Sequence, residues 1–141
     1  MSYSIKNVSD MFGISSYTIR FYDKEGLFPY ITRNKSGNRE FTDDDLEWIK
    51  IICCLKNTGM KIKEIKQYID WYMLGDTTKM KRKKLLIDHR SEVLNQIEEL
   101  KKNLEIINHK ISLYEVPDNE LEQPNCVTPS YAHQNSLIKD A

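Results

Sequence analysis

The sequence of 141 residues contains little cysteine, glycine or proline and no long hydrophobic run. Its three cysteines are unevenly spaced, so they do not suggest a disulfide framework. No apolar segment approaches the roughly 18 residues that are needed to span a bilayer. The first residues also lack an apolar stretch of signal-peptide length. We therefore expect a cytoplasmic protein with no membrane partner.

Residues that commonly carry catalysis or bind metals are also sparse. The three histidines are scattered along the chain, and no nucleophile–base pair is evident. Cys53 and Cys54 are adjacent, but Cys126 is far from them in sequence. This arrangement does not provide the set of thiolates that a soft metal needs. We expect no enzyme activity, no metal site and no cofactor.

The net charge is zero, but the charges are unevenly distributed. Between Ser16 and Arg39, five basic residues stand against two acidic ones, a local excess of three positive charges. Residues 117–141 are instead mostly acidic and polar, which predicts a flexible acidic tail. A neutral protein with one basic edge is suited to binding nucleic acid through that edge.

Glycines and capping residues divide the first part of the chain into short helices. Ser4 can cap a helix that ends at Gly13, and Ser15 or Ser16 can cap a second helix that ends at Gly26. Two short helices joined by a Gly-containing turn make a helix-turn-helix. The second helix of such a motif is the usual reader of the DNA major groove.

The next segment predicts a two-stranded hairpin, or wing. Pro29 ends the preceding helix, aromatic and β-branched residues flank a polar centre, and residues 36–38 supply the turn. Thr42, with an aspartate three residues on, predicts a capped helix that ends near Gly59. Another helix is predicted from Ile62 to about Leu74.

The longest predicted helix starts at Thr77 or Thr78. Its later apolar residues alternate in steps of four and three, which is the a/d pattern of a coiled coil. The stripe consists of Val93, Ile97, Leu100, Leu104, Ile107, Ile111 and Tyr114. At 1.5 Å per residue, a helix over residues 86–114 is about 43 Å long, too long for the preceding residues to cover. We expect two subunits to pair along this stripe as a homodimer.

The predicted fold class is therefore mainly α, with a winged helix-turn-helix head and a long coiled-coil helix. Residues 1–75 would form the DNA-binding domain with its two linking helices. Residues 76–116 would form the coiled-coil dimerisation helix, and the acidic tail would follow from residue 117.

This order of elements resembles the MerR family of transcriptional regulators. "YSIKNVSDMFGISSYTIRFYDKEGLFP" is similar to the family's helix-turn-helix, and "TRNKSGNREFTDDDL" is similar to its wing. "LKNTGMKIKEI" resembles the segment that opens the family's fourth helix, so the likeness covers roughly residues 3–70. Three positions depart from the family pattern, namely Phe21, Asn38 and Lys61.

The resemblance and the helix-turn-helix pattern together predict the DNA contacts. Arg20 can pair with guanine or hold a phosphate, and the neighbouring hydroxyls suit backbone oxygens. The wing carries further cations that would reach phosphates on one side. Lys61 stands where the family usually has a capping hydroxyl and offers an ammonium group to phosphate instead. The predicted DNA-binding residues are Thr18, Arg20, Tyr22, Arg33, Lys35, Arg39 and Lys61.

Two heads on one coiled coil imply a two-fold symmetric site in double-stranded DNA, an inverted repeat. The resemblance implies that the dimer sits on a promoter and bends and untwists the DNA. The promoter elements then realign for RNA polymerase, which would be a partner by proximity.

The likeness extends to the short thiol- and aldehyde-responsive branch of the family. Members of this branch have a cysteine five residues before the Gly that precedes the fourth helix, which here is Cys54 before Gly59. "GDTTKMKRKKLLIDHR" also resembles a segment of that branch. The resemblance implies that electrophile or oxidant modification of Cys54 switches the regulator. Helix geometry places Cys53 on the core face and Cys54 at a seam beside Lys50, and a structural role for Cys54 stays open.

Two alternatives keep the same DNA-binding head. In one, the dimer senses a small non-covalent ligand, with Tyr68, Trp71 and Tyr72 as candidate walls of its pocket. In the other, the protein is a DNA architectural or accessory protein without any switch.

Overall fold

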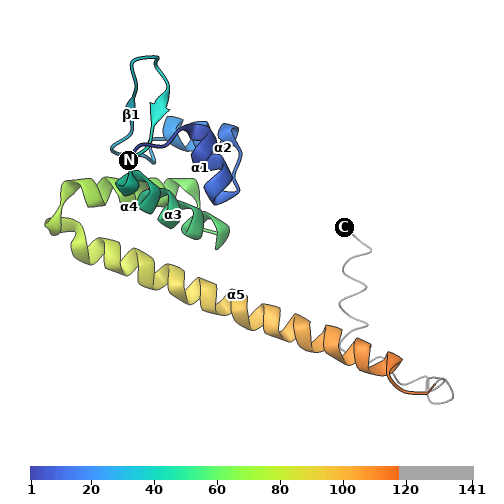
Figure 1. The fold of residues 1–141 in the computed structure, drawn as a ribbon. Helices are drawn as coiled ribbons and strands as arrows, with labels where there is room; N and C mark the ends of the chain where they lie inside the picture. The colour runs from blue at the N-terminus through green and yellow to red at the C-terminus, as the bar shows by residue number, and fades with distance from the viewer. Residues whose placement is uncertain (118–141) are drawn as a thin grey trace, which may run out of the picture. The chain divides into compact units, whose positions relative to one another are not determined.

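The computed structural model describes residues 1–117, so Cys126 and nearly all of the predicted acidic tail lie outside the described residues. The chain divides into two units, Met1–Leu94 and Asn95–Ala141. The described part is mainly helical, with a helix-turn-helix head and a long C-terminal helix, which confirms the predicted fold class (Figure 1). In chain order, the elements are α1 (Ile5–Phe12), α2 (Ser16–Lys24), β1 (Thr32–Arg33), β2 (Arg39–Glu40), α3 (Asp43–Asn57), α4 (Ile62–Leu74), the 3₁₀ helix η1 (Asp76–Thr78) and α5 (Lys79–Tyr114).

The helix-turn-helix is defined at its ends by local hydrogen bonds. Ser4 Oγ accepts a hydrogen bond from the Asn7 N–H at 3.1 Å, and Asn7 Oδ1 accepts from the Ser4 N–H at 2.9 Å. Gly13 ends α1 with a φ of 65°, in the left-handed region that favours glycine. Ser15 Oγ then caps α2 by accepting from the Thr18 N–H at 3.0 Å. These caps confirm the predicted start and end of the motif's first helix.

The wing is a short antiparallel hairpin in which Thr32 pairs with Glu40. Its turn is held by the Asn34 side chain, whose Oδ1 accepts from the N–H of Ser36 at 2.9 Å and of Asn38 at 3.0 Å. The Asn34 N–H also donates to the Asn38 carbonyl at 2.8 Å. The predicted hairpin is therefore confirmed, and its turn is built around an Asx-type arrangement.

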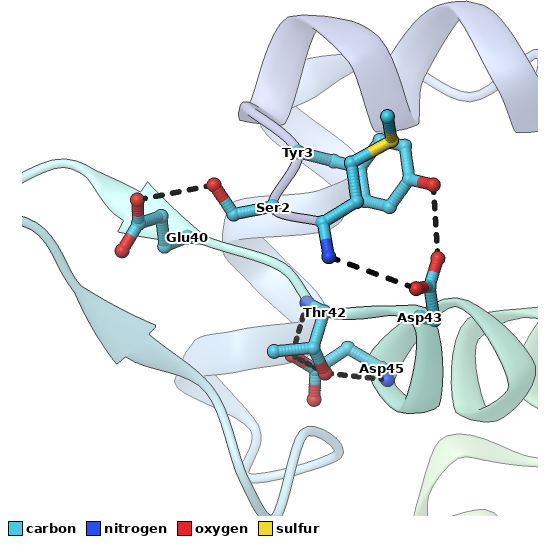
Figure 2. Close-up of polar contacts among 7 residues, drawn as sticks. Ser2, Tyr3, Glu40, Thr42, Asp43 and Asp45 are labelled. Atoms are coloured by element: carbon cyan, nitrogen blue, oxygen red, sulfur yellow. Dashed lines mark hydrogen bonds and ion pairs between the residues drawn. The ribbon is translucent and has the colours of Figure 1, made fainter.

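The N-terminal segment pairs with the chain just after the wing, a contact that sequence analysis did not predict. The Tyr3 N–H donates to the Phe41 carbonyl at 2.7 Å, and the Phe41 N–H donates to the Tyr3 carbonyl at 2.9 Å. Figure 2 shows the Tyr3 hydroxyl donating to Asp43 Oδ1, at 2.9 Å. This bond to a carboxylate raises the pKa of Tyr3. Ser2 Oγ also donates to Glu40 Oε1 at 3.2 Å, so the segment links the wing to the start of α3.

Thr42 and Asp45 form the predicted capping box of α3 (Figure 2). Thr42 Oγ1 accepts from the Asp45 N–H at 3.2 Å, and Asp45 Oδ2 accepts from the Thr42 N–H at 2.8 Å. Asp45 is only 3% exposed. Its carboxylate is stable there because it accepts hydrogen bonds and lies at the positive end of the helix dipole.

The core of the head is formed by α1 to α4 and the segments around the wing. Phe28 and Phe41 meet edge to face, with ring centroids 6.0 Å apart. Leu85, from the start of α5, packs against this core as a partly buried residue. The buried members are Val8, Ile19, Tyr22, Leu27, Phe28, Phe41, Ile49, Ile52, Leu55, Met60, Ile65 and Ile69.

A hydrogen-bonded corner joins α4 to α5, and it involves Trp71, Gly75, Thr78 and Arg82. The Thr78 hydroxyl donates to the Trp71 carbonyl and lies 2.8 Å from the Gly75 carbonyl. Arg82 Nε donates to Thr78 Oγ1 at 3.1 Å, and Arg82 Nη2 donates to the Gly75 carbonyl at 3.3 Å. Gly75 has φ 87° and ψ −157°, a combination that is essentially restricted to glycine.

The long helix α5 begins at Lys79, slightly later than the predicted Thr77 or Thr78. The reason is that Thr78 belongs to the 3₁₀ turn, where its hydroxyl bonds to carbonyls of the preceding turn. Along α5 only His89 is buried. The predicted stripe residues from Ile97 onward are 42–74% exposed.

Among residues 1–117, no helix has both the length and the apolar composition of a membrane span.

Candidate nucleic-acid interface

Helix α2 exposes Arg20, the predicted major-groove contact. Within residues 1–117, the Arg20 guanidinium has no hydrogen-bond or ion-pair partner, so its donors are available to DNA. Thr18, on the same helix, is half-buried, and its hydroxyl lies 2.9 Å from Ser15 Oγ.

Tyr22 lies on the opposite, core-facing side of α2 and is 6% exposed. Burial raises its pKa, and the nearby Cys53 of α3 adds to this effect. The ring therefore packs α2 against α3. A DNA contact from Tyr22 stays a prediction, and only its hydroxyl could make it.

Tyr17 is a candidate that sequence analysis missed. It lies three residues before Arg20, which places both side chains on one face of α2, and it is 78% exposed. Its phenol hydroxyl suits a phosphate or base edge. The helical spacing could have indicated this exposure, because Ile19 and Tyr22 lie on the buried face of α2 and Tyr17 does not.

A polar hollow of about 570 Å³ brings together three of the predicted DNA-binding residues. Arg20 of α2 lines it with Arg33 and Arg39 of the wing. Lys6, from the start of α1, adds a cation that sequence analysis did not single out. Cations from α1, α2 and the wing thus border one concave surface, which suits a DNA backbone.

Arg39 also has a second role inside the head. Its Nε donates to Asp23 Oδ2 at 2.7 Å, and the two side chains are only 18% and 20% exposed. Because Asp23 lies on α2 and Arg39 on β2, this ion pair holds the wing against the recognition helix. Arg33 is likewise oriented, since its Nη1 donates to the Gly37 carbonyl at 2.7 Å.

The other two predicted cations lie elsewhere. Lys35 is exposed near the tip of the wing, where it lines an open hollow with Arg33. Lys61 is exposed at the N-cap of α4, where it makes no side-chain capping bond, and it does not line the hollow around Arg20.

The two adjacent cysteines of α3 have different surroundings. Cys53 is half-buried and packs against the core, and burial raises the pKa of its thiol. Cys54 is exposed. The Thr58 hydroxyl lies 2.7 Å from the Cys54 carbonyl oxygen.

Among the described residues, no group of three or more histidine, cysteine, aspartate or glutamate side chains could hold a metal ion.

Comparison with known proteins identifies the family of this head and helix. Residues 3–70 match the family described as "MerR HTH family regulatory protein", and residues 46–109 match "MerR, DNA binding". An "Uncharacterized HTH-type transcriptional regulator" of Haemophilus influenzae is 44% identical over 115 residues, which cover 82% of this chain and 85% of that protein. The chain belongs to the MerR family.

Several solved structures of MerR regulators have the same fold. One of them is the crystal structure of HiNmlR, "a MerR family regulator lacking the sensor domain, bound to promoter DNA". Its sequence is 43% identical to this chain, and the two structures superpose with a TM-score of 0.75 over 82% of this chain and 91% of HiNmlR. A MerR regulator from Bacillus thuringiensis is 46% identical with a TM-score of 0.73, covering 79% of this chain and 98% of that one. The regulator AdhR of Bacillus subtilis is 34% identical over 91 residues, 64% of this chain and 65% of AdhR. This MerR-family chain is a DNA-binding transcriptional regulator.

Proposed function

We propose that this MerR-family regulator binds an inverted-repeat promoter as a homodimer, distorts the DNA, and is switched when an electrophile or oxidant modifies Cys54. Residues 1–75 would read the DNA and residues 76–116 would form the dimer. RNA polymerase would respond to the distorted promoter. The observation that carries the switch is the exposure of Cys54 on α3, beside the half-buried Cys53.

The exposed stripe of α5 supports the dimer. Ile97, Leu100 and Leu104 are 42%, 67% and 55% exposed. Exposed apolar residues at a/d spacing are stabilised when a second helix covers them. A two-fold axis along such a pair would present two equal heads, and hence an inverted-repeat site.

The predicted DNA contacts come from α2, the wing and the N-cap of α4. Arg20 would reach a base edge or a phosphate, and Arg33 and Lys35 would bind phosphates. Arg39 would contribute mainly by holding the wing, with its remaining guanidinium donors open to phosphate. Lys61 would contact the DNA backbone from the N-cap of α4.

The chemistry proposed for Cys54 is addition to an electrophilic carbon. The thiolate sulfur would attack an aldehyde carbon and the thiol proton would end on the carbonyl oxygen, which gives a hemithioacetal. An exposed thiol is accessible for this step, whereas the raised pKa of Cys53 disfavours the reactive thiolate there. A disulfide between the two is excluded while they are helical, because adjacent Cα atoms are about 3.8 Å apart, below the usual range for disulfides. HiNmlR, a MerR family regulator "lacking the sensor domain", is similar to this chain over 91% of its own length, which supports a short regulator without a separate sensor domain.

A pair of matched variants tests the proposal. Cys54→Ser and Cys53→Ser should both keep promoter binding in a mobility-shift titration. In a transcription assay with purified polymerase and an added aldehyde, Cys54→Ser should lose the response and Cys53→Ser should retain it. An unchanged response in Cys54→Ser would rule out the proposed switch. A bound promoter whose transcription never changes would instead favour a switch-free accessory role.

A second candidate is a regulator that senses a small non-covalent ligand. A hollow of about 340 Å³, lined in part by Trp71 and Leu85, lies between α4 and the first turns of α5. Tyr68 and Tyr72 do not line it but border a separate hollow with Trp48. Induction that persists when every cysteine is replaced would support this candidate.

A further inference from the structure

A partly buried hydrogen bond joins the end of α3 to α5, within the first unit of the chain. Thr58 follows the last residue of α3, and its Oγ1 lies 2.7 Å from Nε2 of His89 on α5. The same oxygen lies 2.7 Å from the Cys54 carbonyl and 3.2 Å from the Leu55 carbonyl. One hydroxyl group therefore contacts both the residue proposed as the sensor and the long helix.

Because the Thr58 hydroxyl carries a single proton, it can donate only one hydrogen bond, and this determines which atom donates in the bond to His89. Thr58 has one hydroxyl proton, and a backbone carbonyl can only accept. When that proton is donated to the Cys54 carbonyl, His89 must carry a proton on Nε2 and donate it to the Thr58 oxygen. If His89 were instead unprotonated at Nε2, the Thr58 proton would turn toward it and leave the Cys54 carbonyl.

His89 is buried, and buried positions on a helix are usually occupied by apolar residues. It is 8% exposed and is the only buried residue that α5 contains. A buried imidazole needs a hydrogen-bond partner, and its other nitrogen, Nδ1, is 3.9 Å from Glu92 Oε2, beyond hydrogen-bond distance. The bond to Thr58 thus provides a hydrogen-bond partner for Nε2 of His89. Because it is directional, it also fixes how the end of α3 lies against α5 more narrowly than apolar packing alone.

We infer that Thr58 is a positioning residue that transmits modification of Cys54 from α3 to α5. An adduct on the exposed Cys54 sulfur would displace the last turn of α3, and Thr58 lies one turn further along the same helix end. Its hydroxyl is bonded to the carbonyl of the modified residue and to the imidazole of His89, so a shift at one contact changes the other. This inference rests on the proposed switch at Cys54, and it names the route to the dimer helix.

The test uses the 141-residue chain with Cys53→Ala and Cys126→Ser, so that Cys54 is the one thiol of this sequence. The Cys54 thiolate attacks methyl methanethiosulfonate, whose S–S bond breaks to give a methyl mixed disulfide on Cys54 and release methanesulfinate. Mass spectrometry measures the extent of labelling. Thr58→Val removes the hydroxyl at nearly constant shape, and Thr58→Ser restores it. Each variant is measured for promoter affinity before labelling and for the change in transcription after it.

We expect Thr58→Val to be labelled as fully as its parent and to bind unmodified promoter within about twofold. Its transcription response should fall roughly fivefold, the loss expected when a coupling of about one hydrogen bond is removed. Thr58→Ser should respond like the parent. Equal labelling with a full response in Thr58→Val would overturn the inference.

A second pair of variants decides the matter if Thr58→Val does not fold. His89→Leu removes the imidazole, and His89→Gln keeps an N–H donor near the position of Nε2. Loss of response in His89→Leu with partial recovery in His89→Gln supports the inference, and full response in His89→Leu overturns it. Failure of the proposed switch is distinguished by Cys54→Ser: a response that survives in that variant means Cys54 is not the sensor, whatever Thr58 does.

Discussion

The ion pair between Asp23 and Arg39 allows a test in which geometry and simple electrostatics predict opposite results. Asp23→Asn removes one negative charge from each head, close to the predicted DNA surface. If charge alone mattered, promoter affinity would rise. If the pair positions the wing, affinity would fall although the protein has become more positive.

General magnitudes for hydrogen bonds and for charges in water give the size of each effect. A hydrogen bond to a charged group contributes about 1.5–3 kcal/mol. Asn keeps a neutral acceptor, so we expect the free energy of unfolding to fall by about 1 kcal/mol, a value in keeping with the partial burial of both side chains. The charge effect is smaller, since two unit charges about 10 Å apart in water interact by roughly 0.4 kcal/mol before salt screening. We expect the wing displacement to dominate and promoter affinity to fall about threefold to tenfold.

The assay is a fluorescence-anisotropy titration with a duplex that the wild-type protein selects from random sequence, together with urea unfolding. Glu25→Gln is the matched control: Glu25 lies two residues further along, and its carboxylate makes no hydrogen bond or ion pair with residues 1–117. The control should bind as tightly as wild type or slightly more tightly. If Asp23→Asn binds at least as tightly as wild type and unfolds at the same urea concentration, the ion pair does not position the wing.

Further predictions concern the wing, the α3 cap, the stripe of α5 and the cysteines. Arg33→Ala should lower the slope of log affinity against log salt by about 0.9 per head, measured by titration at several salt concentrations, and an unchanged slope would remove Arg33 from the phosphate contacts. Thr42→Ala should reduce the free energy of unfolding by about 1 kcal/mol in urea, because it removes the capping box. Leu104→Asp should give monomers in analytical ultracentrifugation and lose tight promoter binding, whereas a stable dimer would contradict the proposed pairing. In maleimide labelling of a Cys126→Ser variant followed by mass spectrometry, Cys54 should react before Cys53 near neutral pH. Cys53 should react appreciably only at higher pH than an ordinary thiol, because burial raises its pKa and keeps it protonated.

Local features of the fold could be predicted from the sequence because their causes are local. Ser4 and Thr42 cap the helices that follow them, and the capping residues stand next to the elements that they start. The helix predicted from Ile62 to about Leu74 has those bounds in the structure. Such features depend on backbone geometry within one turn, which a short stretch of sequence determines.

Contacts between distant residues could not be predicted in the same way. The pairing of Asp23 with Arg39 joins residues 16 positions apart, and that of Thr58 with His89 joins residues 31 positions apart. No helical or strand period relates such positions, so only the packed fold brings them together. The motif indicated that Arg39 would face DNA, but it did not indicate that the same side chain holds the wing.

The corner between α4 and α5 also bears on how regulators of this kind can be recombined. Its bonds are contained within residues 71–82, and the Thr58–His89 bond closes before residue 94. A chimera joined after Leu94 would carry all of these contacts with the head, and a foreign helix could follow the junction. A chimera joined at Gly75 would separate Thr78 and Arg82 from the carbonyls they hold. If α5 pairs two subunits as proposed, a new pairing specificity could therefore be grafted onto this head without rebuilding its corner, provided that the junction follows Leu94.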